Sequence, residues 1–173
     1  MSEQKIIQTV GLYAVALDSH SWDLFDAVFA PDVESDYPGG LHWRDLASFK
    51  ADFTRMHEPV ISHQHHLGMP QVVIDGDRAW TLTYGTYRLL RAARVEKFGD
   101  MTEGGAWYDD ELARGPAGWR IVKRKARNFW WRGTYPEDGD CPVAVNSFPE
   151  EAAAGRVGYI NALRLRLARQ QEA

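Results

Sequence analysis

The sequence is poor in cysteine, contains no long apolar run and carries no excess of basic residues. Cys141 is the single cysteine among 173 residues, so an internal disulfide cannot form and a reducing compartment is expected. No apolar stretch approaches the ~20 residues of a membrane span, and the N-terminus lacks the features of a signal peptide. The net charge of −4 disfavours a protein that binds nucleic acid or membrane surfaces. We therefore expect a cytoplasmic protein without such partners.

Short motifs that mark several catalytic classes are also missing. The chain contains no glycine-rich phosphate loop, no nucleophile elbow and no internal repeat. A His-Glu-x-x-His metal motif is absent, although His63 and His65 at strand spacing could supply two metal ligands. The prediction is accordingly no metal and no cofactor.

The residues that are present indicate one folded domain rich in aromatic side chains. Apolar residues make up 45% of the chain, which suffices for a full core. Seven Trp, seven Tyr and seven Phe suit a core that surrounds a cavity, and they suit a dense ordinary core equally well.

Helical signals dominate the early part of the chain. The first helix is predicted from an apolar stripe at three- and four-residue spacing: Ile6, Val10, Tyr13 and Leu17. A short helix over residues 22–30 follows, with Ser21 as its N-cap, and a strand is predicted over residues 33–37. Asp45 is predicted to cap a third helix, whose apolar stripe runs from Leu46 to Met56.

Strand signals dominate the second half. Extended segments over residues 62–74, 79–94, 101–112 and 119–131 alternate with tight turns and predict an antiparallel meander, with Pro70 at a bulge or bend. A loop over 134–148 and a final helix over 150–171 complete the chain. Helices followed by strands indicate an α+β fold. The final helix has an uneven apolar pattern, which favours contact with a neighbouring subunit.

A carboxylate and an imidazole are the strongest candidates for chemistry. On an alternating strand His63 and His65 share one face with apolar Leu67 and Met69, so both histidines are expected to point inward. Asp18 follows the apolar stripe of the first helix. A curved sheet laid over that helix could bring Asp18 to His65, and an aspartate can orient a histidine and stabilise its charged form.

The last strand adds a basic candidate. Alternation places five side chains on one face: Val122, Arg124, Ala126, Asn128 and Trp130. Arg124 could line a pocket with Tyr13, or it could form a salt bridge with a carboxylate. Asp109, Asp110 and Glu111 are adjacent on a strand, so they alternate faces and do not form a simple carboxylate pair.

A series of short motifs runs through about residues 4–135 in a fixed order. They are Leu17-Asp18, Trp22-Asp23, Phe29-Ala30-Pro31-Asp32-Val33, Gln64-His65-His66-Leu67-Gly68, Ile74-Asp75-Gly76-Asp77, Gly105-Ala106-Trp107-Tyr108 and Gly118-Trp119-Arg120. Their order and spacing resemble the SnoaL-like branch of the nuclear transport factor 2-like superfamily. The nearest similarity is to its dehydratases, which include bile-acid 7α-dehydratase, scytalone dehydratase and lindane dehydrochlorinase.

The resemblance implies a fold and an assembly. It implies a cone-shaped α+β domain over residues 1–135, in which a strongly curved antiparallel or mixed sheet wraps the N-terminal helices around a deep, mostly apolar pocket. Residues 136–173 would form an extension with a helix, packed on the same domain or on a neighbouring subunit. Relatives are dimers or trimers, so a homo-oligomer is expected, with the trimer favoured.

The resemblance also implies an activity and its residues. Asp18 and His65 match an Asp–His dyad that moves protons, while Tyr13 and Arg124 match further catalytic positions. Tyr87 stands where the bile-acid enzyme carries a carboxylate. The residues predicted to bind the substrate are Trp22, Met69, Tyr87, Trp107, Asn128 and Trp130. The expected function is a cofactor-independent lyase or isomerase acting on a small hydrophobic cyclic molecule. The alternatives are a non-catalytic ligand-binding or assembly module and a polyketide-cyclase-like enzyme.

Overall fold

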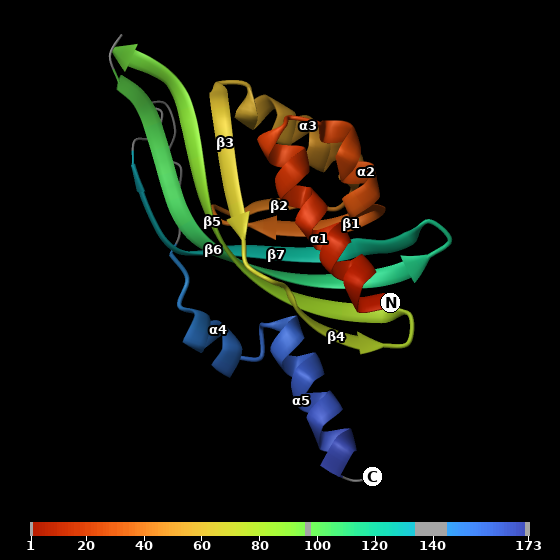
Figure 1. The fold of residues 1–173 in the computed structure, drawn as a ribbon. Coiled ribbons are helices and arrows are strands. Elements are labelled where there is room, and N and C mark those ends of the chain that lie inside the picture. The colour runs from red at the N-terminus through yellow and green to blue at the C-terminus, as the bar shows by residue number, and fades with distance from the viewer. Residues whose placement is uncertain (1, 96–97, 134–144, 172–173) are drawn as a thin grey trace.

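A curved mixed sheet separates an N-terminal helical layer from two C-terminal helices (Figure 1). The structure is a computed structural model, and it describes residues 2–95, 98–133 and 145–171. The predicted α+β class is confirmed. None of the helices within those ranges has the length and apolar character needed to cross a membrane.

The helical layer follows the predicted apolar stripes. Its elements are α1 (Ser2–Asp18), the 3-10 turn η1 (Trp22–Leu24), α2 (Phe25–Val28) and α3 (Leu46–His57). Asp45 caps α3 as predicted, because its Oδ1 accepts a hydrogen bond from the Ser48 backbone N–H at 2.8 Å. The second helix ends two residues earlier than predicted. Ala30 precedes Pro31, and a residue before proline is driven into extended backbone, so β1 already begins at Phe29.

Within the described residues, seven strands form the sheet. They are β1 (Phe29–Tyr37), β2 (Leu41–Trp43), β3 (Val60–Leu67), β4 (Gln71–Asp75), β5 (Arg78–Val95), β6 (Phe98–Gly115) and β7 (Gly118–Gly133). Their order is β2-β1-β7-β6-β5-β3, and β4 also pairs with β5. The β1–β7 pair is parallel and the others are antiparallel. The predicted strand over residues 62–74 is wrong in one respect: residues 68–70, which include Pro70, separate β3 from β4.

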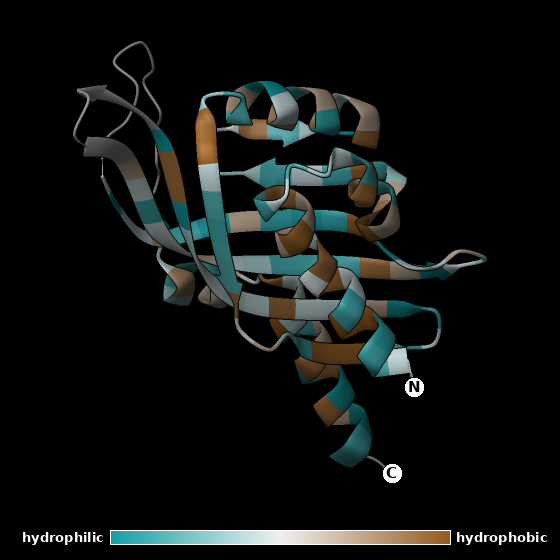
Figure 2. Ribbon diagram, turned by 45° about the horizontal axis from the view of Figure 1, so that its top comes forward, coloured by the Kyte–Doolittle hydropathy of each residue, from teal (hydrophilic) through white to brown (hydrophobic). Residues whose placement is uncertain are grey.

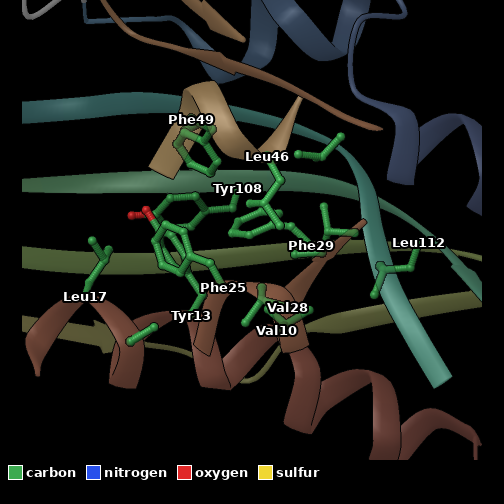
Figure 3. Close-up of a cluster of buried hydrophobic side chains, with 14 of the residues drawn as sticks. Val10, Tyr13, Leu17, Phe25, Val28, Phe29, Leu46, Phe49, Tyr108 and Leu112 are labelled. Carbon is green, nitrogen blue, oxygen red and sulfur yellow. The ribbon is translucent and has the colours of Figure 1, made fainter. Parts of the chain in front are cut away.

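The main core lies between the helical layer and the concave face of the sheet. Figure 3 shows α1, α2 and α3 side chains packed against those of β1 and β6, with Tyr13, Phe25 and Tyr108 close together. Phe25 and Phe49 are fully buried, and their ring centroids lie 5.6 Å apart. This part of the interior is therefore a dense aromatic core rather than a cavity.

A smaller core lies on the outer face of the sheet, beneath α4 (Phe148–Ala153) and α5 (Gly158–Gln171). Its buried members are Leu82, Trp107 and Val157. The predicted single helix over 150–171 is divided at Gly155, whose φ of +69° suits glycine. Asp109 caps the N-terminus of α5, because its carboxylate accepts hydrogen bonds from the backbone N–H groups of Gly158 and Tyr159. Most of the predicted loop over 134–148 lies outside the described residues.

Candidate active site

The last residue of α1 meets the middle of β3. The Asp18 Oδ1 atom lies 2.7 Å from Nδ1 of His65. The same carboxylate accepts the His65 backbone N–H, with distances of 2.9 Å to Oδ2 and 3.2 Å to Oδ1. The backbone N–H and the ring Nδ1 of His65 therefore hold both carboxylate oxygens of Asp18. The structure brings together the two residues that the sequence singled out.

This carboxylate is held in its charged form. Partial burial acts to raise the pKa of Asp18, but the hydrogen bonds from the His65 ring and backbone outweigh it, so the pKa lies below the ordinary value. The Asp18 side chain is 30% exposed, whereas that of His65 is 7% exposed. The pair therefore borders solvent on the carboxylate side.

The second ring nitrogen of His65 is available for proton transfer. A charged carboxylate can only accept, so the neutral ring carries its hydrogen on Nδ1 and a lone pair on Nε2. Among the described residues, no group forms a hydrogen bond to this Nε2. The arrangement is that of a general base oriented by an aspartate.

Aromatic side chains surround the imidazole. The Tyr87 ring is stacked beside that of His65, with centroids 6.1 Å apart, and Tyr13 meets it edge-on at 6.2 Å. Tyr87 donates a hydrogen bond to Asn128 Oδ1 at 3.3 Å. Gly104 makes this possible, because a Cβ there would lie 2.5 Å from the Tyr87 hydroxyl oxygen. The Asn128 amide nitrogen has no partner among the described residues although the side chain is almost fully buried.

Tyr13 is a neutral hydroxyl donor next to the dyad. It is buried in the core, and its hydroxyl oxygen accepts a hydrogen bond from the Tyr37 hydroxyl at 3.1 Å. Its own proton is therefore free for another acceptor. Burial above all, with further contributions from Tyr37 and Tyr108, raises the pKa of Tyr13 well above its ordinary value. The phenol stays protonated at neutral pH.

Arg124 contacts Tyr13 and forms a buried ion pair with Asp110. Its Nε and Nη2 atoms each lie 2.7 Å from an oxygen of Asp110, and the two side chains are 1% and 0% exposed. The guanidinium carbon lies 4.1 Å from the centre of the Tyr13 ring. The salt bridge foreseen as an alternative is thus present. Asp110 was missed because a bulge next to Glu111 shifts the β6–β7 register by one residue.

Three residues predicted to bind the substrate lie away from the dyad. Met69 is 77% exposed in the connection between β3 and β4. Trp107 faces the outer core and lies 5.1 Å from the ring of Phe148. Trp130 pairs with Gly105 because β7 bulges after Asn128, so its indole lies on the face opposite to Asn128.

More histidines gather beside the end of α1. The ring of His63 lies 4.6 Å from that of His20 and 4.9 Å from that of His57. Trp22 packs against His20 and His57, so it borders these histidines rather than the dyad. Within the described ranges, no three His, Cys, Asp or Glu side chains are arranged to hold a metal ion.

A cavity of about 420 Å³ lies on the outer side of the sheet, beside the start of α5. Of the residues predicted to be catalytic, it is lined by Arg124 alone. Charged groups dominate its lining and already have partners: Lys123 lies 3.5 Å from Glu34, and Lys125 donates to the carbonyl of Arg156. This cavity is therefore not the apolar pocket that the family resemblance implied.

Comparison with known proteins identifies the class of protein. Residues 2–125 match the model of the SnoaL-like domain, so the chain belongs to the SnoaL-like family. Uncharacterized proteins of Mycobacterium tuberculosis and Mycobacterium bovis are 32% identical over 117 residues, which cover 65% of this chain and 75% of theirs.

Solved structures share the fold. The Kfla4162 protein of Kribbella flavida has a TM-score of 0.71 and 23% identity, over 76% of this chain and 93% of its own. A protein of Novosphingobium aromaticivorans, provisionally assigned as a scytalone dehydratase, has a TM-score of 0.67 and 14% identity, over 83% and 94%. At these identities the similarity shows the fold alone.

Proposed function

We propose that this protein is a cofactor-independent lyase or isomerase that acts on a small hydrophobic cyclic molecule. The observation that carries the proposal is the 2.7 Å contact between Asp18 and His65, which leaves the far nitrogen of the ring open. Aromatic side chains around the imidazole, Tyr13 and Tyr87, support an apolar cyclic ligand.

The chemistry begins with removal of a proton. His65 Nε2 takes a proton from a carbon beside a carbonyl group, and Asp18 stabilises the imidazolium that forms. The released electron pair produces an enolate. If the next carbon carries a hydroxyl group, the enolate expels it, and the hydroxyl takes the imidazolium proton and leaves as water. If the substrate has no leaving group but carries a carbon–carbon double bond conjugated with the enolate, the imidazolium returns the proton to the far carbon of that double bond, and an isomer with a shifted double bond results.

Two neutral donors can stabilise the enolate oxygen. Tyr13 has a free hydroxyl proton because Tyr37 occupies only its oxygen. Asn128 has a free amide nitrogen because Tyr87 occupies only its carbonyl oxygen. Donors fixed before the reaction stabilise developing charge more effectively than mobile water does. Asp18, His65, Tyr13 and Asn128 are therefore the residues we assign to catalysis and binding.

The test uses cyclic ketones with a hydroxyl group on the carbon β to the carbonyl. Elimination gives a conjugated enone, whose ultraviolet absorbance reports turnover. We expect His65→Gln to reduce kcat by roughly 10²–10⁴-fold, the usual contribution of general acid–base catalysis. His66→Gln is the matched control, because His66 is the exposed neighbour on the opposite face of β3.

Two outcomes would separate the alternatives. A substrate that His65→Gln converts at the wild-type rate would remove His65 from the mechanism. Tight binding of the ketones with no turnover by the wild-type protein would instead favour a ligand-binding module on the same fold.

A further inference from the structure

The proposed reaction leaves one inward-facing histidine of β3 unused. His63 lies two residues before His65, so the two side chains emerge on the same face of the strand. It is 8% exposed, and its Nδ1 atom lies 3.0 Å from the carbonyl oxygen of Leu17. Leu17 immediately precedes Asp18. Successive inward histidines of β3 therefore bind successive residues at the end of α1.

We propose that His63 is a positioning residue, which holds the end of α1 so that the Asp18 carboxylate stays on His65. The inference rests on the proposed function and extends it. Asp18 is the last residue of α1, and the Leu17 carbonyl just before it accepts the His20 backbone N–H at 3.1 Å as well as the His63 ring, which is its one bond to the sheet among the described residues. Helix ends fray. A bond from the sheet to Leu17 restrains the backbone one residue before the carboxylate.

The polar groups of His63 favour this role over simple packing. A carbonyl oxygen can only accept, so Nδ1 carries the hydrogen and Nε2 carries a lone pair. That Nε2 is buried, and no described residue forms a hydrogen bond to it. An unpaired buried nitrogen destabilises a protein, so an apolar residue would serve better here if filling space were the only requirement.

The surroundings of His63 also keep it neutral. The titratable groups that face it are His20, His57, His65 and Asp18. Burial first, and then His57, lowers the pKa of His63 to about 4. At neutral pH the ring therefore binds Leu17 without placing a second positive charge beside the Asp18 carboxylate, where it would compete with His65.

The experiment compares His63→Asn with His63→Gln. The amide nitrogen of asparagine lies two bonds beyond Cβ, as Nδ1 of histidine does, whereas that of glutamine lies three bonds beyond it, as Nε2 does. We measure the pKa of Asp18 from the pH dependence of its carboxyl ¹³C signal. In His63→Asn we expect it below the ordinary value, as in the wild type. In His63→Gln we expect it to rise to the ordinary value or above, because burial is then no longer outweighed by the bonds from His65.

Asp45 provides an internal control. Its pKa is lowered by Ser48, remote from His63, so it should not change in either variant. Equal pKa values of Asp18 in the two variants would overturn the proposal. A second measurement uses the wild type alone and so does not depend on the folding of a variant. ¹⁵N spectra should show the hydrogen of the His63 ring on Nδ1, and a hydrogen on Nε2 would also overturn the proposal.

Turnover separates this inference from the proposed function. With a ketone that the wild type converts, we expect kcat to be about 10²-fold lower in His63→Gln than in His63→Asn, since small misplacements of catalytic groups have effects of that size. If no ketone is converted but the pKa of Asp18 still rises in His63→Gln alone, the positioning role holds and the proposed reaction fails.

Discussion

Removal of the charge of Asp110 should destabilise this protein strongly. Asp110 and Arg124 are 0% and 1% exposed and form two contacts of 2.7 Å, one to each carboxylate oxygen. The Asp110→Asn substitution keeps the shape of the side chain but leaves the guanidinium buried without a countercharge. Loss of one partner from a buried ion pair costs about 3–5 kcal/mol. We expect the free energy of unfolding to fall by that amount.

This loss is large enough to measure in two ways. For a chain of this length each kcal/mol shifts Tm by about 2–4 °C, so Tm should fall by roughly 6–20 °C. In urea the midpoint should fall while the slope m stays unchanged. Asp75→Asn is the matched control: Asp75 pairs with Arg169 at the surface, with exposures of 59% and 66%, and its loss should cost less than ~1 kcal/mol.

A double variant tests the physical reason. Asp110→Leu combined with Arg124→Met removes both charges, so neither is left buried without a partner, and it should recover most of the stability lost in Asp110→Asn. The reasoning would be refuted if Asp110→Asn were as stable as the wild type. It would also be refuted if the double variant were less stable than Asp110→Asn, because the cost would then come from lost packing and not from charge.

Two further predictions concern acid and assembly. Burial lowers the pKa of both His57 and His63 from 6.5 to about 4, so the unfolded chain binds more protons than the folded chain in that range. The free energy of unfolding should therefore fall as the pH drops from about 6.5 to about 4. Equal urea midpoints across that range would contradict this. We also propose that the chain forms a homo-oligomer, with a trimer favoured, through the C-terminal half of α5, where Leu165 and Leu167 are 61% and 49% exposed. Light scattering should give a smaller mass when both are replaced by Gln, and a monomeric wild type would reject the idea.

Patterns that depend on neighbouring residues predicted the elements well. The stripe from Ile6 to Leu17 is buried as predicted, because a helix repeats every 3.6 residues whatever packs against it. Asp45 caps α3 for a similarly local reason, the unsatisfied N–H groups of the first turn. The polar middle of β3 is visible in Figure 2, where hydrophilic colour runs between apolar ends.

The sheet face and the cross-strand partner of each residue were harder to predict, because one bulge changes both for every residue beyond it. The Gly115–Gly118 turn fixes the β6–β7 register only as far as Leu112, which pairs with Ile121. Beyond the first bulge Asp110 pairs with Arg124, which simple alternation would have placed opposite Asp109. A second bulge then turns Trp130 away from Asn128. Neither bulge has a signal such as proline or glycine at the inserted residue.

The meeting of Asp18 and His65, 47 residues apart, depends on where the apolar pattern stops on two elements at once. Leu17 is the last buried residue of α1, and the next side chain is a carboxylate. The inward face of β3 changes to His63 and His65, whose polar groups would be costly there without partners. The end of α1 supplies both partners, the Leu17 carbonyl and the Asp18 carboxylate. Each element alone looks like an imperfect core segment, and only their joint placement explains why the imperfections coincide.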